Sequence, residues 1–436
     1  MQFNSNLKYL LPIFLCSISA QSFFSTVMPI NNGSENARTA SLGGSNIEDS
    51  YFNPSSGSFG SRFQFSLGLE FRAHRETRSY PAIDMFEDVV TQNTYVINRD
   101  LYESMPWRIG IEITDYIKIP ISFTFGQKLF WDNRFDYQEE VRGNLGSGVY
   151  NRDPVVGYHI YNMDGVINSN YFNIAILPWR EIQFGVTVEH LIGNNLSHEI
   201  GVNVIQADEA LSADTTTLAI NSYSSVVTNR VNLGLILPIS NATKLGFTLR
   251  QGLKVDFTSS NYLPLINERT QLPGLTITDS SSSFSISVPT EYELGFSMRS
   301  RNKVKSYING NIKYSDRGTS DAIIIVNNSG NDSLNLKLKN TLHASIGIEH
   351  WIFDKAPFRF GFSYLGSPIN DELERTIFSI GTGWVFEEFV IDISTTYGRV
   401  GYQYEDLFPP FGQDNGALET VSESSFKTMI SLNYAF

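Results

Sequence analysis

The segment FKTMISLNYAF, residues 426–436, decides how this sequence is interpreted. Its large apolar side chains fall on alternate positions, and smaller or polar residues fill the positions between them. The apolar set is Phe426, Ile430, Leu432, Tyr434 and Phe436, and the other set is Lys427, Met429, Ser431, Asn433 and Ala435. A period of two is that of a β-strand whose two faces meet different surroundings. The segment therefore predicts a strand with one oily face and one polar face.

The same alternation recurs upstream, for example over residues 63–71 and 358–364. It indicates about fourteen strands, an even number as single-chain bacterial barrels have. The expected strands lie near 62–74, 106–115, 118–131, 167–177, 180–192, 228–237, 242–257, 284–299, 303–315, 340–352, 356–365, 374–386, 388–402 and 422–436. The predicted fold is all-β, a transmembrane antiparallel β-barrel.

The connections between these strands alternate strictly between tight turns and long polar segments. The turns fall at 115–118, 178–180, 238–242, 300–303, 354–356 and 387–388, and the long segments at 75–105, 132–166, 193–227, 258–283, 316–339, 366–373 and 403–421. Outer-membrane barrels have short periplasmic turns and longer external loops, whereas a soluble sandwich does not sort its loops by end. We therefore expect a multi-pass protein of the bacterial outer membrane with both termini in the periplasm.

Composition excludes several other classes of protein. The chain has 436 residues, is 13% aromatic and 18% charged, and has a mean hydropathy of −0.15. It contains no apolar run of the roughly 18 residues that a transmembrane helix needs. A net charge of −13 gives no electrostatic footprint for nucleic acid.

The N-terminus is typical of an export signal. Lys8 supplies positive charge, residues 9–18 are apolar, and residues 18–20 offer a small-residue cleavage site. The predicted organisation is a signal peptide over 1–20, an N-terminal segment over 21–61 and the barrel over 62–436. Cys16, the only cysteine, raises the alternative of a lipidated lipoprotein, although Leu15 before it is larger than the residue such processing prefers.

Two stretches of the N-terminal segment resemble a known family. The sequence ARTASLGGS at 37–45 and the sequence YFNPS at 51–55 are similar to the N-terminal hatch of the long-chain fatty-acid outer-membrane transporters (FadL-type). The resemblance implies that Gly43, Gly44, Asn53 and Pro54 belong to a hatch inside the lumen. It further implies that outer loops capture hydrophobic compounds and pass them through the wall. Related Por-type barrels instead serve as partners in secretion and surface attachment.

Two further features bear on transport. One apolar face of a short helix is predicted by the spacing of Ala82, Met85, Phe86, Val89 and Val90. This face would line a ligand groove, or it would only pack against neighbouring loop residues and stabilise the loop. Pro120 cannot donate to a strand ladder, so it would kink the third strand and open the wall. The alternative is that Pro120 stands at the strand start, where proline is tolerated.

Catalytic signatures are lacking, because the six histidines form no metalloprotease motif and no nucleophile elbow or phosphate loop occurs. We therefore expect no enzyme, no metal and no cofactor. Charges of both signs on the predicted inner face are interpreted as pairs that hold the hatch and loops.

The leading hypothesis is passive uptake of a hydrophobic small molecule, such as a long-chain fatty acid. The alternatives are a Por-type protein partner and a general porin. Expected partners are outer-membrane lipid, the hydrophobic ligand and the barrel-assembly machinery, which would read the strand ending in Phe436.

Overall fold

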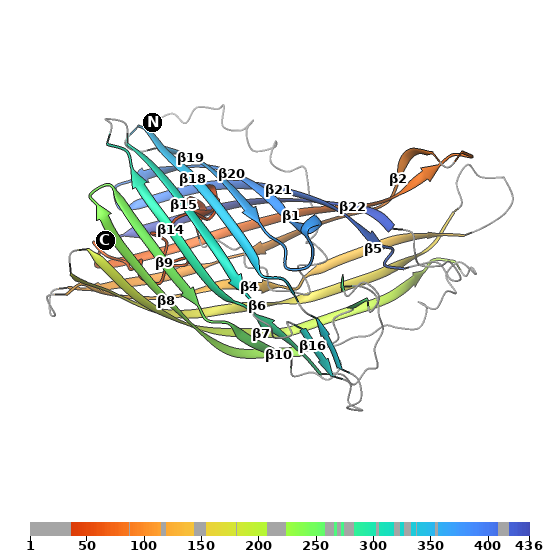
Figure 1. Ribbon diagram of the computed structural model, residues 1–436, viewed down its shortest axis with the longest axis horizontal. Coiled ribbons are helices and arrows are strands. Elements are labelled where there is room, and N and C mark those ends of the chain that lie inside the picture. The colour runs from red at the N-terminus through yellow and green to blue at the C-terminus, as the bar shows by residue number, and fades with distance from the viewer. Residues whose placement is uncertain are drawn as a thin grey trace, which may run out of the picture.

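The computed structural model shows a closed antiparallel β-barrel of 14 strands, which confirms the predicted fold class (Figure 1). It describes residues 36–86, 88–114, 119–143, 154–179, 181–206, 224–257, 266–267, 272–273, 283–301, 305–317, 323–326, 333–336, 338–353, 356–408 and 418–436. The predicted signal peptide, Cys16 and residues 21–35 lie outside the described residues.

The wall is one 16-stranded sheet in which two crossings of the barrel are each divided into two strands. These divided crossings are β2 (Val89–Ser104) with β3 (Trp107–Ile113), and β4 (Ile121–Asp132) with β5 (Phe135–Arg142). The undivided members are β1 (Phe63–Ile83), β6 (Val155–Trp179), β7 (Ile182–Val204), β8 (Ser224–Ser240), β9 (Thr243–Arg250), β14 (Thr290–Arg299), β15 (Ser306–Asp316), β18 (Thr341–Phe353), β19 (Ala356–Leu365), β20 (Arg375–Phe386), β21 (Phe389–Glu405) and β22 (Leu418–Ala435).

Smaller elements lie at the ends of the wall. A four-stranded sheet joins β10 (Leu253–Phe257), β13 (Ser283–Val288), β16 (Ile323–Val326) and β17 (Ser333–Leu336). A short pair joins β11 (Ile266–Asn267) and β12 (Leu272–Pro273), and the helical elements are α1 (Ala37–Ser41) and the 3₁₀ turn η6 (Asp371–Leu373). None of the helices in the described residues is long and apolar enough to cross a membrane.

The last strand closes the barrel. It pairs with β1 from Gln64 opposite Ala435 to Ser79 opposite Thr420, and with β21 on its other edge. Met429 and Ser431 are fully buried, whereas Ile430 between them is 41% exposed. The two faces predicted from residues 426–436 are therefore confirmed.

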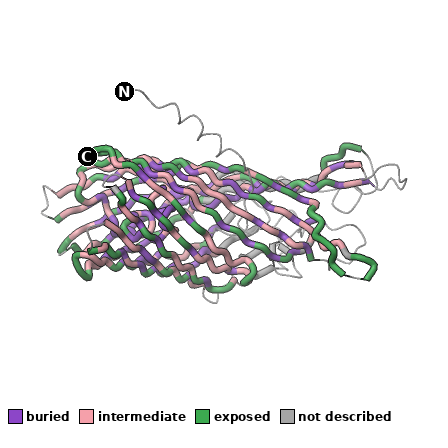
Figure 2. The backbone as a smooth tube through the Cα atoms, turned by 90° about the horizontal axis from the view of Figure 1, so that it is seen from above, coloured by how far each residue is buried: buried purple, intermediate pink, exposed green. Residues whose placement is uncertain are grey.

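Alternating burial continues around the barrel (Figure 2). Large apolar side chains point outward and stay exposed, among them Leu69, Ile111, Phe125, Phe172, Val186, Leu233, Phe247, Leu294, Ile312, Ile348, Phe360, Ile380 and Ile391. Inward positions hold small and charged residues. This inverted pattern suits a barrel whose outer surface meets lipid rather than water.

The structure corrects two predicted loops. Residues 75–105 and 132–166 are largely strand, because β1 and β2 form one long hairpin and β5 and β6 form another (Figure 1). The outward residues of β5, which are Asp136, Gln138 and Glu140, are exposed and polar. Beyond the lipid both faces of a strand tolerate polar residues, so the alternation in hydropathy fades while the backbone ladder continues.

The predicted helix over residues 82–90 is also wrong. Ala82 belongs to β1, Val89 and Val90 belong to β2, and a turn joins the two strands. The Asp84 carboxylate accepts hydrogen bonds from the backbone N–H groups of Phe86 and Asp88, at 2.8 and 3.0 Å. Such a side-chain to backbone bond is what favours aspartate in turns, and it outweighs the helical spacing of the apolar residues.

Candidate functional site

Residues 36–61, which we call the inner segment, pack against the inward surface of the barrel. Their helix α1 contacts β19, β20, β21 and β22. It ends in two glycines with positive φ, Gly43 at 67° and Gly44 at 79°, a backbone that side chains with a Cβ rarely adopt. These two glycines therefore turn the chain inside the lumen.

Wall glycines make room for this backbone. A Cβ placed on Gly361 of β19 would overlap the backbone N of Gly43, and one on Gly185 of β7 would overlap the carbonyl oxygen of Pro54. A Cβ on Gly347 of β18 would come within 2.5 Å of the carbonyl oxygen of Leu42. The sequence signal for this contact is glycine at inward positions of several strands, a signal that alternation in hydropathy does not reveal.

Asn53 and Pro54 lie where the inner segment meets β6, β8 and β9. The Asn53 side chain donates to the carbonyl oxygen of Leu235 at 3.2 Å and accepts from the backbone N–H and hydroxyl of Ser55. The carbonyl oxygen of Pro54 accepts from the Asn173 amide at 2.7 Å. Both predicted residues are therefore tied to the wall by hydrogen bonds.

Ion pairs add to this attachment. Arg38 makes two bonds to Glu349, at 2.9 and 3.1 Å, and Glu349 also pairs with Arg359 at 2.6 Å. Arg108 of β3 pairs with Asp49 at 3.1 Å. Removing one partner of a buried ion pair is costly, because it leaves an uncompensated charge away from water. Ion pairs of the kind predicted for the inner-face charges therefore join the wall to the inner segment.

Other inward charges pair along the wall instead. Lys128 contacts Glu189 at 2.6 Å, and Arg250 contacts Glu293 at 2.8 Å. These pairs line a space that is partly open to solvent and whose floor includes Gly43, Gly44 and Phe52 of the inner segment. We call this space the chamber. Among the described residues, no group of three or more His, Cys, Asp or Glu side chains is placed to hold a metal ion.

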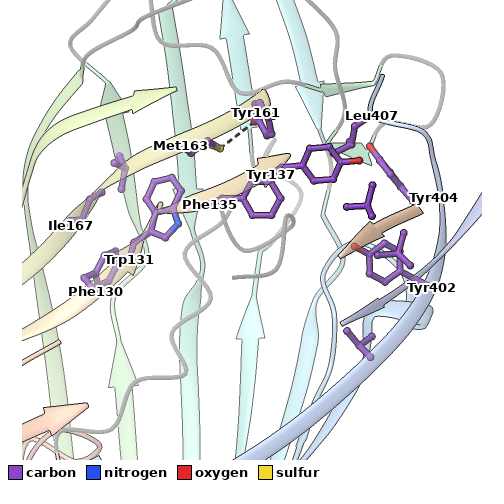
Figure 3. Close-up of a cluster of buried hydrophobic side chains, with 14 of the residues drawn as sticks. Phe130, Trp131, Phe135, Tyr137, Tyr161, Met163, Ile167, Tyr402, Tyr404 and Leu407 are labelled. Atoms are coloured by element: carbon purple, nitrogen blue, oxygen red, sulfur yellow. Dashed lines mark hydrogen bonds between the residues drawn. The ribbon is translucent and has the colours of Figure 1, made fainter. Parts of the chain in front are cut away.

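An aromatic cluster borders the chamber. It extends from Phe130 and Trp131 at one side to Tyr402 and Tyr404 at the other (Figure 3). The other buried members are Val96, Phe135, Tyr137, Tyr161, Met163, Ile167, Leu191, Val255, Val288, Val400, Leu407, Phe408 and Val421. Phe130 and Trp131 belong both to the cluster and to the chamber lining, so the two are continuous.

The third barrel crossing is irregular at these two residues. The pairing of β4 with β6 shifts register between Leu129 and Trp131, so one extra residue enters the strand there. Phe130, Trp131 and Asp132 are consequently all buried in succession. A β-bulge of this kind bends a strand and redirects its side chains, and here it brings two large aromatic rings inward.

A gap in the backbone ladder follows the bulge. The pairing of β3 with β4 ends at Trp107 opposite Gln127, and β2 pairs with β1 alone. Within residues 88–114 and 119–143, all of which are described, no backbone pairing joins β2 to β4 or β5. We call this interval the wall gap. The exposed side chain of Leu101 lies on the outer face of its β2 edge.

Side chains rather than backbone groups span the wall gap. The guanidinium of Arg134 lies over the Tyr102 ring at 4.7 Å and donates to the carbonyl oxygen of Glu103 at 3.3 Å. The backbone N–H of Gln138 donates to the Asn98 side chain at 3.3 Å. Side-chain bridges open at less cost than a continuous ladder, because only a few bonds must break.

Pro120 does not interrupt the wall. It stands immediately before β4, and its carbonyl oxygen accepts from the N–H of Leu177 at 3.0 Å. The irregularity of the third crossing lies at Leu129–Trp131 instead. Proline at a strand start costs no ladder bond, which is why this position tolerates it.

The apolar residues proposed for a ligand groove lie at the tip of the β1–β2 hairpin. Met85 is 88% exposed, Phe86 75%, Val90 68% and Val89 59%. None of the four lines the chamber or joins the aromatic cluster. A ligand role for them stays a prediction.

Three carboxyl groups at the outer end of the cluster give it a pH dependence. Burial, reinforced by Asp406, raises the pKa of Glu419 to about 7, and burial also raises the pKa of Glu139 and of Asp406. The packed state therefore holds protons that an open state releases. Its stability is greatest at low pH and falls as the pH rises through about 7.

We expect hydrogen exchange in residues 402–408 to speed up about tenfold between pH 5 and pH 8, after correction for the intrinsic rate. Mass spectrometry of peptides from the folded protein measures this rate. Glu419→Gln cannot ionise, so most of the change should disappear in that variant. An identical pH response in both proteins would contradict the assignment.

Comparison with solved structures finds the same fold in two toluene transporters and a FadL homologue. The Pseudomonas putida toluene transporter TodX superposes with a TM-score of 0.59 at 14% identity, over 93% of this chain and 99% of that chain. The Ralstonia pickettii toluene transporter TbuX gives 0.55 at 14% identity, over 93% and 99%. A Pseudomonas aeruginosa FadL homologue gives 0.50 at 12% identity, over 96% and 99%.

These likenesses confirm the resemblance to FadL-type barrels at the level of the fold. No protein-family model and no curated protein matches the sequence.

Proposed function

We propose that this protein is an outer-membrane channel for passive uptake of hydrophobic small molecules, which enter at the aromatic cluster and leave sideways through the wall gap. The observation that carries the proposal is the unpaired interval between β2 and β4–β5, with Phe130 and Trp131 directly behind it. In the proposed orientation both termini face the periplasm, and the aromatic cluster lies at the end of the barrel toward the cell exterior.

The inner segment acts as a hatch in this proposal. Its hydrogen bonds to β6 and β8 and its ion pair to Glu349 hold it against the wall. The chamber above it is lined by charged groups such as Lys128, Glu189 and Arg250. An apolar solute would gain no binding free energy there, because charged groups lose hydration when a solute displaces water from them. A sideways exit beside Leu129 avoids most of this cost.

The aromatic cluster supports the ligand class. Flat aromatic faces favour aromatic or aliphatic ligands through offset stacking and burial of apolar area. Two of the structural neighbours are toluene transporters by name. We propose a monoaromatic hydrocarbon or the apolar chain of a fatty acid as the ligand. The Por-type role in secretion or attachment, and a general porin, are the alternatives.

Closing the wall gap tests the proposal. Ile97→Cys and Gln138→Cys place two thiols on the outer face of the two strands that border the gap, next to the bond from the Gln138 N–H to the Asn98 side chain. A flexible bis-thiol reagent would join them, in a Cys16→Ser background that removes the only other thiol. We expect uptake of radiolabelled toluene and of labelled oleate by a channel-deficient bacterial host to fall about tenfold or more, and to recover after reduction.

A second cysteine pair controls for the chemistry. Thr395 of β21 and Thr428 of β22 are already opposite one another in the ladder, so joining them should leave uptake unchanged. Unaltered uptake after the gap is joined would contradict a sideways exit. A porin would pass the small solutes sucrose and chloride in both proteins, and a secretion partner would show no uptake in either.

A further inference from the structure

Three exposed arginines lie in one row across four neighbouring strands on the outer face of the barrel. Arg75 of β1 is directly opposite Arg99 of β2, and on its other side it is opposite Ser424 of β22. Ser424 is in turn opposite Arg399 of β21. Neighbouring strands are about 4.8 Å apart. All three side chains are exposed and occupy outward positions of their strands.

This row lies at the upper edge of the apolar belt. Phe65, Tyr434 and Phe389 form a matching row near the turns that join the strands at the other end. From Phe65 to Arg75, and from Phe389 to Arg399, the chain advances ten residues. At about 3.3 Å per residue and a tilt of about 40°, ten residues rise about 25 Å, the height of the apolar band of such barrels. The arginines therefore stand at the level of lipid headgroups.

No ion pair joins these arginines to a carboxylate among the described residues, and Glu374, which precedes β20 beside Arg399, accepts a bond from the Tyr364 hydroxyl. Arg399 donates to the Ser422 hydroxyl, at 3.2 and 3.3 Å. The outward positions one step above and below carry no acid: they are Ala73, Thr77, Ile97, Leu101, Tyr397 and Gly401. Like charges directly opposite in an antiparallel pair are destabilising. An anion between the guanidinium groups relieves this repulsion.

We propose that Arg75, Arg99 and Arg399 form a binding surface for the phosphate groups of an outer-leaflet lipid. Guanidinium groups bind phosphate oxygens through paired hydrogen bonds, and each cation near an anionic membrane surface adds to the attraction. The exposed apolar side chains of Leu101 and Tyr397, just below, lie beside the acyl chains of the same lipid. The surface adjoins the β2 edge of the wall gap, so a bound lipid covers the outer side of the proposed exit.

Native mass spectrometry of the purified full chain tests this proposal, with bisphosphorylated lipid A as the probe. The variant carries Arg75→Gln, Arg99→Gln and Arg399→Gln together. We expect the fraction of protein that retains lipid A to fall at least about tenfold. Arg299→Gln is the matched control, since Arg299 is an exposed arginine at the opposite end of the barrel, and it should retain lipid like the unaltered protein.

Further arms of the experiment identify what is recognised. Heat-modifiable gel mobility first verifies that the triple variant is a folded barrel; an unfolded triple variant is replaced by Arg75→Gln with Arg99→Gln. Dephosphorylated lipid A should bind weakly to the unaltered protein and to the variant alike. Equal retention of bisphosphorylated lipid A by both proteins overturns the proposal. Displacement of the lipid by an equal concentration of inorganic phosphate also overturns it, because the site would then recognise free phosphate rather than a lipid.

Discussion

Replacing Gly185 with valine should turn a closed barrel into a conducting one. A Cβ at this position of β7 overlaps the carbonyl oxygen of Pro54 and the backbone N of Ser55. Both backbones are fixed, one in the barrel ladder and the other by the Asn173 amide. Overpacking of this kind costs about 1–3 kcal/mol, which is comparable to the two or three hydrogen bonds that hold Asn53 and Pro54. The inner segment should therefore leave the wall.

Planar-bilayer recording measures the result. The unaltered protein should show almost no steady single-channel conductance, and Gly185→Val should show long open steps. Gly401→Val is the matched control, because a Cβ on Gly401 of β21 would have no neighbour nearer than 3.8 Å. Deleting residues 36–61 should give the full open conductance. A deletion variant that inserts yet stays closed would show that another part of the chain blocks the lumen.

The sequence predicts the barrel well because membrane strands obey one rule over most of their length. Where lipid meets one face and a polar lumen the other, alternation marks each strand, as it does for residues 426–436. All fourteen predicted strands correspond to strands of the structure. Alternation does not mark their upper ends where both faces meet water, as in β5.

The site was less predictable because it depends on register. The bulge at Leu129–Trp131 is a shift in the pairing of β4 with β6, and no residue type in that stretch indicates it. Proline is a visible ladder breaker, so the sequence drew attention to Pro120, about ten residues away. The wall gap is a missing pairing between β2 and β5, and local sequence does not specify which strand edges stay unpaired.

For the inner segment, the important residues were predictable from the sequence, but their partners in the wall were not. Its motif residues Gly43, Gly44, Asn53 and Pro54 could be singled out because of their backbone properties and the family resemblance. Their partners could not, since Gly185, Gly361 and Asn173 are distant in sequence and meet them only in the folded barrel. Alternation also assigns Ser363 to the inner face without revealing that its hydroxyl bonds the Gly43 carbonyl oxygen at 2.7 Å.

Replacing Phe360 with arginine should cost about 2–4 kcal/mol of folding free energy, the range found for arginine at the lipid-facing midplane of a barrel. Phe360 of β19 is 56% exposed, and its neighbours across the ladder, Ile348 and Ile380, are exposed and apolar as well. A guanidinium in this belt has neither water nor a counter-ion. The variant should unfold at a lower guanidinium concentration in lipid vesicles, with an unchanged dependence on denaturant.

Ser345→Arg is the control for that measurement, because Ser345 of β18 faces the chamber and its ladder neighbours, Asn311 and Ser363, are uncharged. Arginine there reaches water and lies near Glu293, which bonds Asn311, so its cost should stay under about 1 kcal/mol. Ser363 itself is unsuitable, since a larger side chain would displace Gly43 as well as add a charge. If Phe360→Arg and Ser345→Arg lowered the free energy of unfolding by the same amount, the belt that includes Phe360 would not face lipid. The membrane orientation on which both the wall gap and the arginine row depend would then be wrong.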